Sequence, residues 1–331
     1  MIEPWNEEIW RNITGNRDRS THALLFCGVP GLGKINLACR YAESLVDKGH
    51  RFASASHPDF HVLSPEAGLG PEGTLLQRYG MRYFVTPPGR KAKSVISVDQ
   101  VRALAGTIVN HAHGTVKVIL ITPAHMMNIN AANALLKSLE EPTTDTVFIL
   151  VSDRPDQLPA TIRSRCSRVD FRVPPRDTAL SWLSARTDDS RRSMALDVAY
   201  GAPLLAEEYL NSGFLDARET VIQDFHAALS GGIDVSTIPG RWKDVEITVA
   251  LRIFNSILVD LVKTAFVRHP PGLNNPDQLD WLQHSSKRIH LKRAFALSAR
   301  IGAYLRDTNS PLDRSLVLED FFFDLVNVGK T

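Results

Sequence analysis

Residues 116–166 read VKVILITPAHMMNINAANALLKSLEEPTTDTVFILVSDRPDQLPATIRSRC. The stretch opens with an apolar run rich in β-branched residues, 116–121, and a second such run occupies 146–152. Runs of this length and composition are typical of strands buried on both faces of a parallel sheet. Between them, residues 131–141 have the composition of a helix, which Pro142 ends. Strand, helix and strand with short joints predict a βαβ unit.

A glycine-rich loop lies nearer the N-terminus. Residues 23–27, ALLFC, predict another buried strand, GVPGLGK follows at 28–34, and a helix is expected over about 36–46. Strand, glycine-rich loop and helix form the context of a phosphate-binding loop. In such a loop the glycines let backbone N–H groups turn toward the phosphates, and the lysine reaches the terminal ones. The candidate nucleotide-binding residues are therefore Gly28, Gly31, Gly33 and Lys34.

Two parts of a working hydrolytic site are missing. The residue after the lysine is Ile35, where a Ser or Thr hydroxyl would bind Mg²⁺. Residues 122–125, TPAH, follow the strand at 116–121 and contain no carboxylate to hold the metal or activate water. Without these groups, phosphoryl transfer loses charge neutralisation and nucleophile positioning. Weak nucleotide binding and a loop kept for folding alone both remain open.

Two motifs carry a family resemblance: NALLKSLEEP at 133–142 and Ser164-Arg165-Cys166. Together they resemble the AAA+ ATPase module of bacterial DNA polymerase III clamp-loader subunits. The resemblance implies that Arg165, flanked by Ser164 and Cys166, is an arginine finger presented to a nucleotide on a neighbouring subunit. It also implies that Ser152 stands where such ATPases sense the γ-phosphate. Most arginines are surface charges, but the ten-residue match favours the finger.

Within that family the chain resembles the delta-prime subunits, the members that have lost their own site. A third loss fits this pattern, because Leu204 and Leu205 stand where active relatives place a nucleotide-contacting arginine. The resemblance implies a non-hydrolysing subunit that assists ATP-dependent loading of the sliding clamp onto primed DNA. It would be a component of the DNA-directed DNA polymerase (nucleotidyltransferase) holoenzyme.

The resemblance also implies partners and cofactors. The expected partners are the other clamp-loader subunits (gamma/tau and delta), the sliding clamp and primed DNA. No cofactor of its own is expected, because the neighbouring subunit would bind ATP and Mg²⁺.

The same family implies three parts. An α/β P-loop AAA+ domain, a parallel sheet with flanking helices, is expected over 1–170, a small helical lid over 171–210, and an all-helical collar over 211–331. A change of composition after Pro174-Pro175 agrees with a joint there. Beyond about residue 211, apolar side chains recur at steps of three and four, which predicts helices, one of them over 242–267.

A metal site is not expected. Relatives commonly carry four zinc-binding cysteines just before a His-Pro-Asp tripeptide, and this chain has the tripeptide at 57–59 without the cysteines. The three cysteines of the chain, Cys27, Cys39 and Cys166, are spaced too widely to form such a site. We therefore predict that no zinc is bound.

Residues 68–93 are rich in glycine, proline and basic side chains, with Tyr79, Tyr83 and Phe84 among them. This mixture predicts an exposed, mobile insertion. The alternative is a surface for single-stranded nucleic acid, in which bases stack on the aromatic rings.

Bulk properties restrict the class of protein. A chain of 331 residues with 44% hydrophobic and 22% charged residues is typical of a soluble protein of two or three domains. The net charge of +2 excludes a strongly basic DNA-wrapping protein. No apolar run is long enough to span a membrane, the N-terminal residues are acidic, and three cysteines do not make a disulfide framework. A cytoplasmic protein is expected.

Two other functions remain as alternatives. One is a self-sufficient AAA+ ATPase or helicase-type motor that hydrolyses its own ATP. The other is a nucleic-acid-binding module that uses the basic insertion together with Arg163, Arg165, Arg168 and Arg172.

Overall fold

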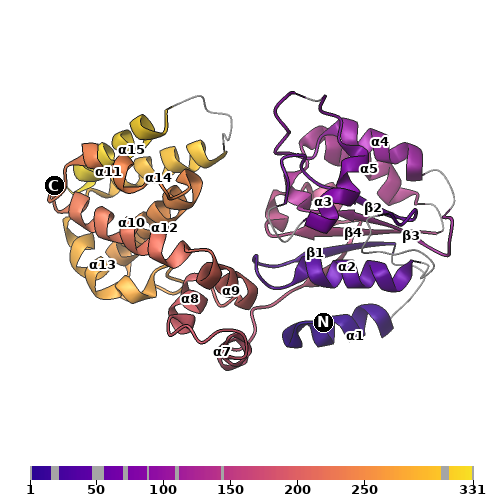
Figure 1. Ribbon diagram of the computed structural model, residues 1–331, viewed down its shortest axis with the longest axis horizontal. Helices are drawn as coiled ribbons and strands as arrows, with labels where there is room; N and C mark the ends of the chain where they lie inside the picture. The colour runs from indigo at the N-terminus through magenta and orange to yellow at the C-terminus, as the bar shows by residue number, and fades with distance from the viewer. Residues whose placement is uncertain are drawn as a thin grey trace. The chain divides into compact units, whose positions relative to one another are not determined.

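The computed structural model of the chain describes residues 2–15, 22–46, 56–69, 74–87, 89–108, 112–142, 145–306 and 313–329. The chain divides into two compact units, Met1–Pro174 and Pro175–Thr331. The first unit holds a five-stranded sheet with helices on its faces, and the described part of the second consists of helices and loops (Figure 1). The expected boundaries at 170 and 210 stay a prediction.

The sheet consists of β1 (Ala23–Cys27), β2 (Phe60–Leu63), β3 (Lys117–Ile121), β4 (Thr146–Ser152) and β5 (Ser167–Asp170). The strand order is β2-β3-β4-β1-β5, and every neighbouring pair is parallel. All residues of β1, β2 and β3 are buried, as the continuous apolar runs predict for strands covered on both faces. The predicted fold class, a parallel sheet with flanking helices followed by a helical region, is confirmed.

Helices cover both faces of the sheet (Figure 1). On one face lies α2 (Lys34–Leu45), and on the other lie α4 (Val98–Ile108) and α5 (Ile129–Glu140). The side chain of Asn128 accepts the N–H of Ala131 at 2.8 Å, so α5 begins two residues before the predicted start. The other helices of this unit are α1 (Glu7–Gly15), α3 (Thr74–Gly80) and α6 (Ala160–Arg163).

The prediction of an exposed insertion at 68–93 is wrong around α3, whereas most of the described residues from 85 to 93 are exposed as expected. Helix α3 and the 3₁₀ turn after it pack against β2, and Tyr79 and Tyr83 are buried. The Tyr79 ring meets Phe60 edge to face, with ring centroids 4.7 Å apart, and the Tyr83 hydroxyl lies 2.6 Å from Nδ1 of His61. Burying the two tyrosines supplies the apolar area that orders this segment. Residues 70–73 and 88 lie outside the described residues.

Asp59 of the His-Pro-Asp tripeptide has a structural role. Its carboxylate is buried and accepts the backbone N–H groups of His113 and Gly114 at 2.8 and 2.7 Å. Burial alone would raise the pKa of Asp59, but these hydrogen bonds outweigh it and lower the pKa. The tripeptide therefore fixes the loop that leads into β3.

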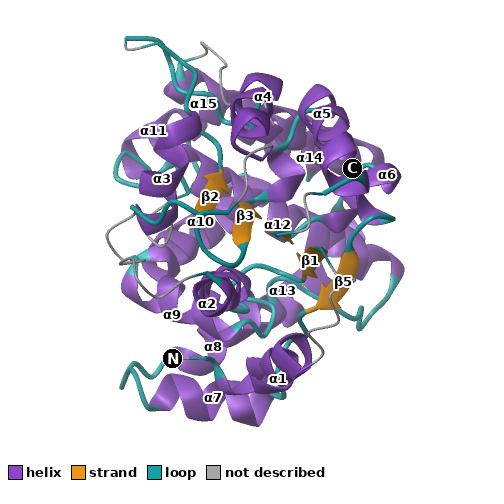
Figure 2. Cartoon of the chain, turned by 90° about the vertical axis from the view of Figure 1, so that its right-hand side faces the viewer, coloured by secondary structure: helices purple, strands orange, loops and turns teal. Residues whose placement is uncertain are grey.

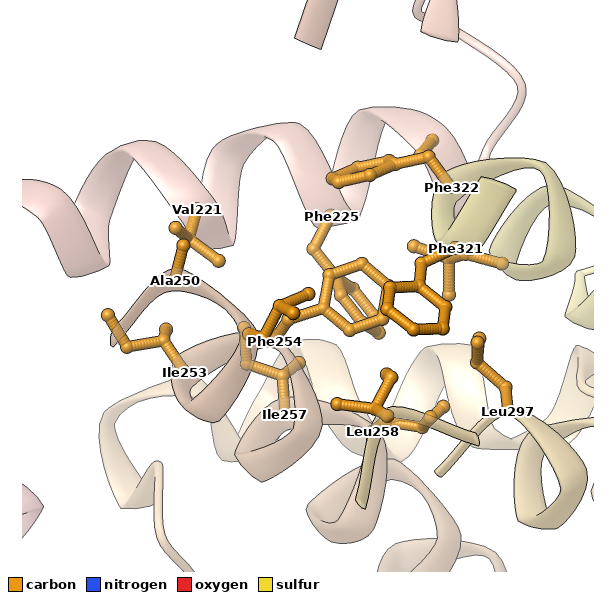
Figure 3. Packing of buried hydrophobic residues seen from close by; sticks show 14 of the residues in the cluster. Val221, Phe225, Ala250, Ile253, Phe254, Ile257, Leu258, Leu297, Phe321 and Phe322 are labelled. Atoms are coloured by element: carbon orange, nitrogen blue, oxygen red, sulfur yellow. The ribbon is translucent and has the colours of Figure 1, made fainter. Parts of the chain in front are cut away.

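The second unit begins with α7 (Arg176–Ser184), α8 (Arg192–Val198) and α9 (Pro203–Asn211), which share a small apolar cluster of their own. A larger cluster joins the helices that follow. In it Phe254 lies between Phe225 and Phe322, with ring centroids 4.9 and 5.1 Å away (Figure 3). These helices are α10 (Phe214–Leu229), α11 (Ile238–Arg241), α12 (Ile247–Phe266), α13 (Leu279–Ser285), α14 (Leu291–Arg306) and α15 (Arg314–Val328).

The predicted single helix over 242–267 is wrong at its start. Helix α12 begins at Ile247 because the Glu246 carboxylate accepts the N–H groups of Thr248 and Val249 and caps it. Trp242 follows α11 instead, and its indole N–H donates to Asp224 at 2.9 Å. Among the described helices of both units, none is both long and apolar enough to cross a membrane.

The stability of the first unit should fall in acid because of His61. Burial, with help from the nearby cations Arg82 and Lys117, lowers the pKa of His61 to about 4. Because the unfolded chain binds a proton near its ordinary pKa of about 6.5 and the folded chain does not, folding stability is lost as pH falls between these values. Lowering the pH from 7 to 5 should cost roughly 2 kcal/mol.

Hydrogen exchange of peptides from β2 and α3, corrected for intrinsic exchange, measures this loss. The variant His61→Gln should reduce the pH dependence, whereas His284→Gln, at an exposed position, should leave it unchanged. An equal pH dependence in wild type and His61→Gln would contradict the assignment.

Candidate functional site

The candidate site lies where three strands end. The register pairs Cys27 of β1 with Ser152 of β4, and Ile121 of β3 with Leu150 of β4. Parallel strands that end together bring the segments after them to one edge of the sheet. The glycine-rich loop, residues 122–125 and the Ser152-Asp153 pair therefore meet at this edge.

The glycine-rich loop has the predicted context, since it joins β1 to α2. Gly33 has φ +83°, which glycine adopts without strain, and α2 begins at the next residue. A Cβ at Gly33 would lie 2.7 Å from the carboxylate of Glu3, so Glu3 would have to move to admit a side chain there.

Lys34 is bound by the chain itself. Its side chain is 4% exposed, and its ammonium lies 2.7 Å from Oδ1 of Asp153 and donates to the carbonyl of Val29 at 2.5 Å. In a working phosphate-binding loop this ammonium faces the terminal phosphates. Asp153 was not predicted from the sequence. Its place directly after Ser152 is the signal that could have found it, once β1 and β4 were paired.

The N-terminal segment also contacts the loop. The side chains of Trp5 and Asn6 donate to the carbonyl of Leu32 at 3.1 and 2.7 Å. The buried carboxylate of Glu3 accepts the side-chain N–H of Asn36, on α2, at 2.8 Å. No local sequence pattern indicated these contacts. Two carboxylates, Glu3 and Asp153, thus lie against a loop whose usual ligand is an anion.

Ser152 is buried and forms its hydrogen bonds within the chain. Its hydroxyl accepts the N–H of Arg154 at 3.2 Å and lies 3.1 Å from Nδ1 of His125. Burial lowers the pKa of His125, so its imidazole is neutral at neutral pH. Mg²⁺ prefers oxygen ligands, and among the described residues there is no group of three His, Cys, Asp or Glu side chains that could hold a metal. The γ-phosphate-sensing role of Ser152 stays a prediction.

Arg165 lies in the turn between α6 and β5. Its Nη1 donates to the Thr161 carbonyl at 2.9 Å, and its Nη2 forms an ion pair with Glu140, the last residue of α5. The arginine side chain is 34% exposed. Among the described residues, no contact joins Arg165 to the loop at 28–34, so the predicted finger does not contact the predicted nucleotide-binding residues.

The residues beside Arg165 hold the turn in place. Ser164 donates its hydroxyl to the Thr161 carbonyl at 3.2 Å. Cys166 packs into the core of the first unit, where burial raises the pKa of its thiol to about 11 and keeps it unreactive. By contrast, Arg163 and Arg168 are exposed, and Arg168 pairs with Asp170 at 2.7 Å.

The amino-acid sequence of this chain is similar to those of known proteins. A family model described as DNA polymerase III, delta subunit, matches residues 6–175, more than half of the chain. DNA polymerase III subunit delta' of Pseudomonas aeruginosa is 31% identical over 313 residues, 89% of this chain and 88% of that protein. The chain belongs to the DNA polymerase III delta-prime family.

Two further relatives extend the comparison. DNA polymerase III subunit delta' of Escherichia coli is 31% identical over 247 residues, 69% of this chain and 67% of its own length. DNA polymerase III subunit tau of Bacillus subtilis is 52% identical over 58 residues, 18% of this chain and 10% of that protein. The predicted resemblance to the delta-prime subunits is therefore confirmed.

In this delta-prime family member, the ion pair between Lys34 and Asp153 should stabilise the first unit. Asp153→Asn leaves a buried ammonium without its counter-charge, and because Asp153 is partly exposed the expected cost is roughly 1–3 kcal/mol. Adding Lys34→Met removes the unpaired cation and should recover part of that loss. Urea denaturation of the four forms measures these changes.

Asp156→Asn, at an exposed position nearby, is the matched control and should change stability by no more than about 0.5 kcal/mol. Strictly additive effects of the two substitutions at Lys34 and Asp153 would show that the ion pair contributes nothing.

Proposed function

We propose that this chain is a non-hydrolysing subunit of the bacterial clamp loader, which assists ATP-dependent loading of the sliding clamp onto primed DNA. Its contribution to catalysis is Arg165, which acts on ATP bound by a neighbouring subunit. One observation carries the proposal. The chain's own Asp153 neutralises the ammonium of Lys34, while the partly exposed side chain of Arg165 stands on a separate turn.

The proposed loss of hydrolysis has an electrostatic basis. Hydrolysis requires a bound cation and a positioned water to offset the charge that develops on the phosphoryl group. Ile35 offers no oxygen ligand, and the segment 122–125 offers no carboxylate. Asp153 cancels the charge of Lys34, and the carboxylate of Glu3, which is bound to Asn36, would repel a nucleotide. The cofactors of the reaction, ATP and Mg²⁺, then belong to the neighbour.

Arginine suits the proposed role in trans. A guanidinium is permanently charged and offers planar, paired N–H donors to phosphate oxygens, which lysine does not reproduce. The partial exposure of Arg165 makes its donors accessible to another subunit. The tau and delta' names of the relatives support a complex of several different subunits around this chain.

The nucleic-acid-binding alternative is weaker than it was from the sequence. The aromatic rings that would stack on bases include Tyr79 and Tyr83, and both are buried. Stacking needs an exposed ring face. A net charge of +2 also gives little general attraction to a phosphate backbone.

The isolated chain should have no ATPase activity at ordinary enzyme rates of about 1 s⁻¹ or more. The substitution Ile35→Thr should not restore it, because the carboxylates after β3 remain absent. A coupled assay of phosphate release by the pure chain measures this. The chain would instead be a self-sufficient ATPase if the activity of the wild type co-purified with the monomer peak and were lost in Lys34→Ala.

Within the assembled clamp loader, Arg165→Ala should lower DNA- and clamp-stimulated ATP turnover while leaving subunit assembly intact. Arginine fingers contribute roughly 10³–10⁵ in rate in the best cases, but a complex with several ATP sites dilutes the loss. Arg165→Lys should rescue little, since it lacks the paired donors. Arg163→Ala and Arg168→Ala are the matched controls and should change turnover much less. Unchanged turnover by an intact Arg165→Ala complex would refute the role in trans.

A further inference from the structure

The turn that carries Arg165 packs beside the C-terminal end of α5, and the two helices α5 and α6 lie side by side (Figure 2). Glu140 is the last residue of α5, and its carboxylate is the one recorded partner of Nη2 of Arg165 among the described residues. Its side chain is 47% exposed, so the contact is not forced by burial.

A carboxylate is unfavourable at this place for the helix alone. The C-terminal end of a helix carries partial negative charge, and an anion there destabilises the helix. Glu140 therefore stands where a helix does not favour a glutamate, and the guanidinium of Arg165 compensates its charge. Helix stability does not explain a glutamate at this position, but the ion pair with Arg165 does.

The recorded hydrogen bonds leave part of the guanidinium free for a ligand. Nη1 donates to the Thr161 carbonyl at 2.9 Å and the Ser164 hydroxyl at 3.4 Å, and Nη2 contacts Glu140. An arginine has five N–H donors. Among the described residues, no acceptor is recorded for Nε, and Nη2 has a second N–H. The contacts thus fix one side of the guanidinium and leave donors for phosphate oxygens.

We propose that Glu140 is a positioning residue for the proposed finger. Its carboxylate holds Nη2 of Arg165, so that the remaining donors point in a fixed direction toward a triphosphate on the neighbouring subunit. Glu140 does not touch that nucleotide and acts through Arg165. This inference rests on the proposed function of Arg165.

The test is a double-mutant cycle in the assembled clamp loader. Exposed ion pairs are weak, so Glu140→Gln should lower the kcat of stimulated ATP turnover by about two- to five-fold, with the KM for ATP unchanged. In an Arg165→Ala background, the same substitution should have no further effect. Glu141→Gln, the adjacent glutamate, is the matched control and should leave kcat unchanged.

Each outcome of the cycle distinguishes one explanation from the others. If Glu140→Gln lowers kcat equally with and without Arg165, it acts through the structure of α5 and the proposal is overturned. If it leaves kcat unchanged, or raises it because the pair restrains the finger, the proposal is also overturned. If Arg165→Ala itself leaves kcat unchanged, the proposed function fails and the positioning role fails with it. Gel filtration of each complex confirms equal assembly.

Discussion

The parallel pairing of β1 with β4 is the constraint on which the rest of the first unit depends. Both strands are almost entirely buried, and a shift of one residue would exchange their faces. The register therefore places Cys27 and Ser152, the last residues of the two strands, side by side. Because the two strands end at the same level, Asp153, which follows β4, lies 2.7 Å from the ammonium of Lys34, at the end of the loop that follows β1.

The same scaffold places its charges in two contrasting environments. At the end of β1, a lysine that usually faces phosphate is buried against carboxylate, and its attraction for another anion is largely cancelled. After α6, Arg165 is held by the Glu140 carboxylate, the Thr161 carbonyl and the Ser164 hydroxyl, but it remains partly exposed. The same scaffold thus neutralises one cation, Lys34, and leaves another, Arg165, partly exposed. Under the proposed function, a loss of hydrolysis in the chain's own site would put no constraint on Arg165, because within the described residues Arg165 has no contact with Lys34.

The sequence predicted the parts whose signals are local. The buried strand at 146–152, the loop from Gly28 to Lys34 and the turn at Arg165 are each encoded by a short run of residues, and the structure contains each of these elements. It did not predict contacts between distant segments. Glu3 against Gly33 and Asp153 against Lys34 depend on the tertiary fold. The burial of Tyr79 and Tyr83 was not predicted, because the basic, glycine-rich composition around them is typical of an exposed segment. In the structure both side chains pack against β2.

The central claim is that Arg165 stabilises the transition state of ATP hydrolysis on another subunit. The most direct measurement is the number of ADP–aluminium fluoride molecules trapped by the assembled, DNA-bound clamp loader, since this complex mimics the transferred phosphoryl group. The wild-type and Arg165→Ala complexes should bind equal amounts of a non-hydrolysable ATP analogue, but the variant should trap ADP–aluminium fluoride at one site fewer. Equal trapping by both complexes would contradict the claim and leave Arg165 as a surface charge.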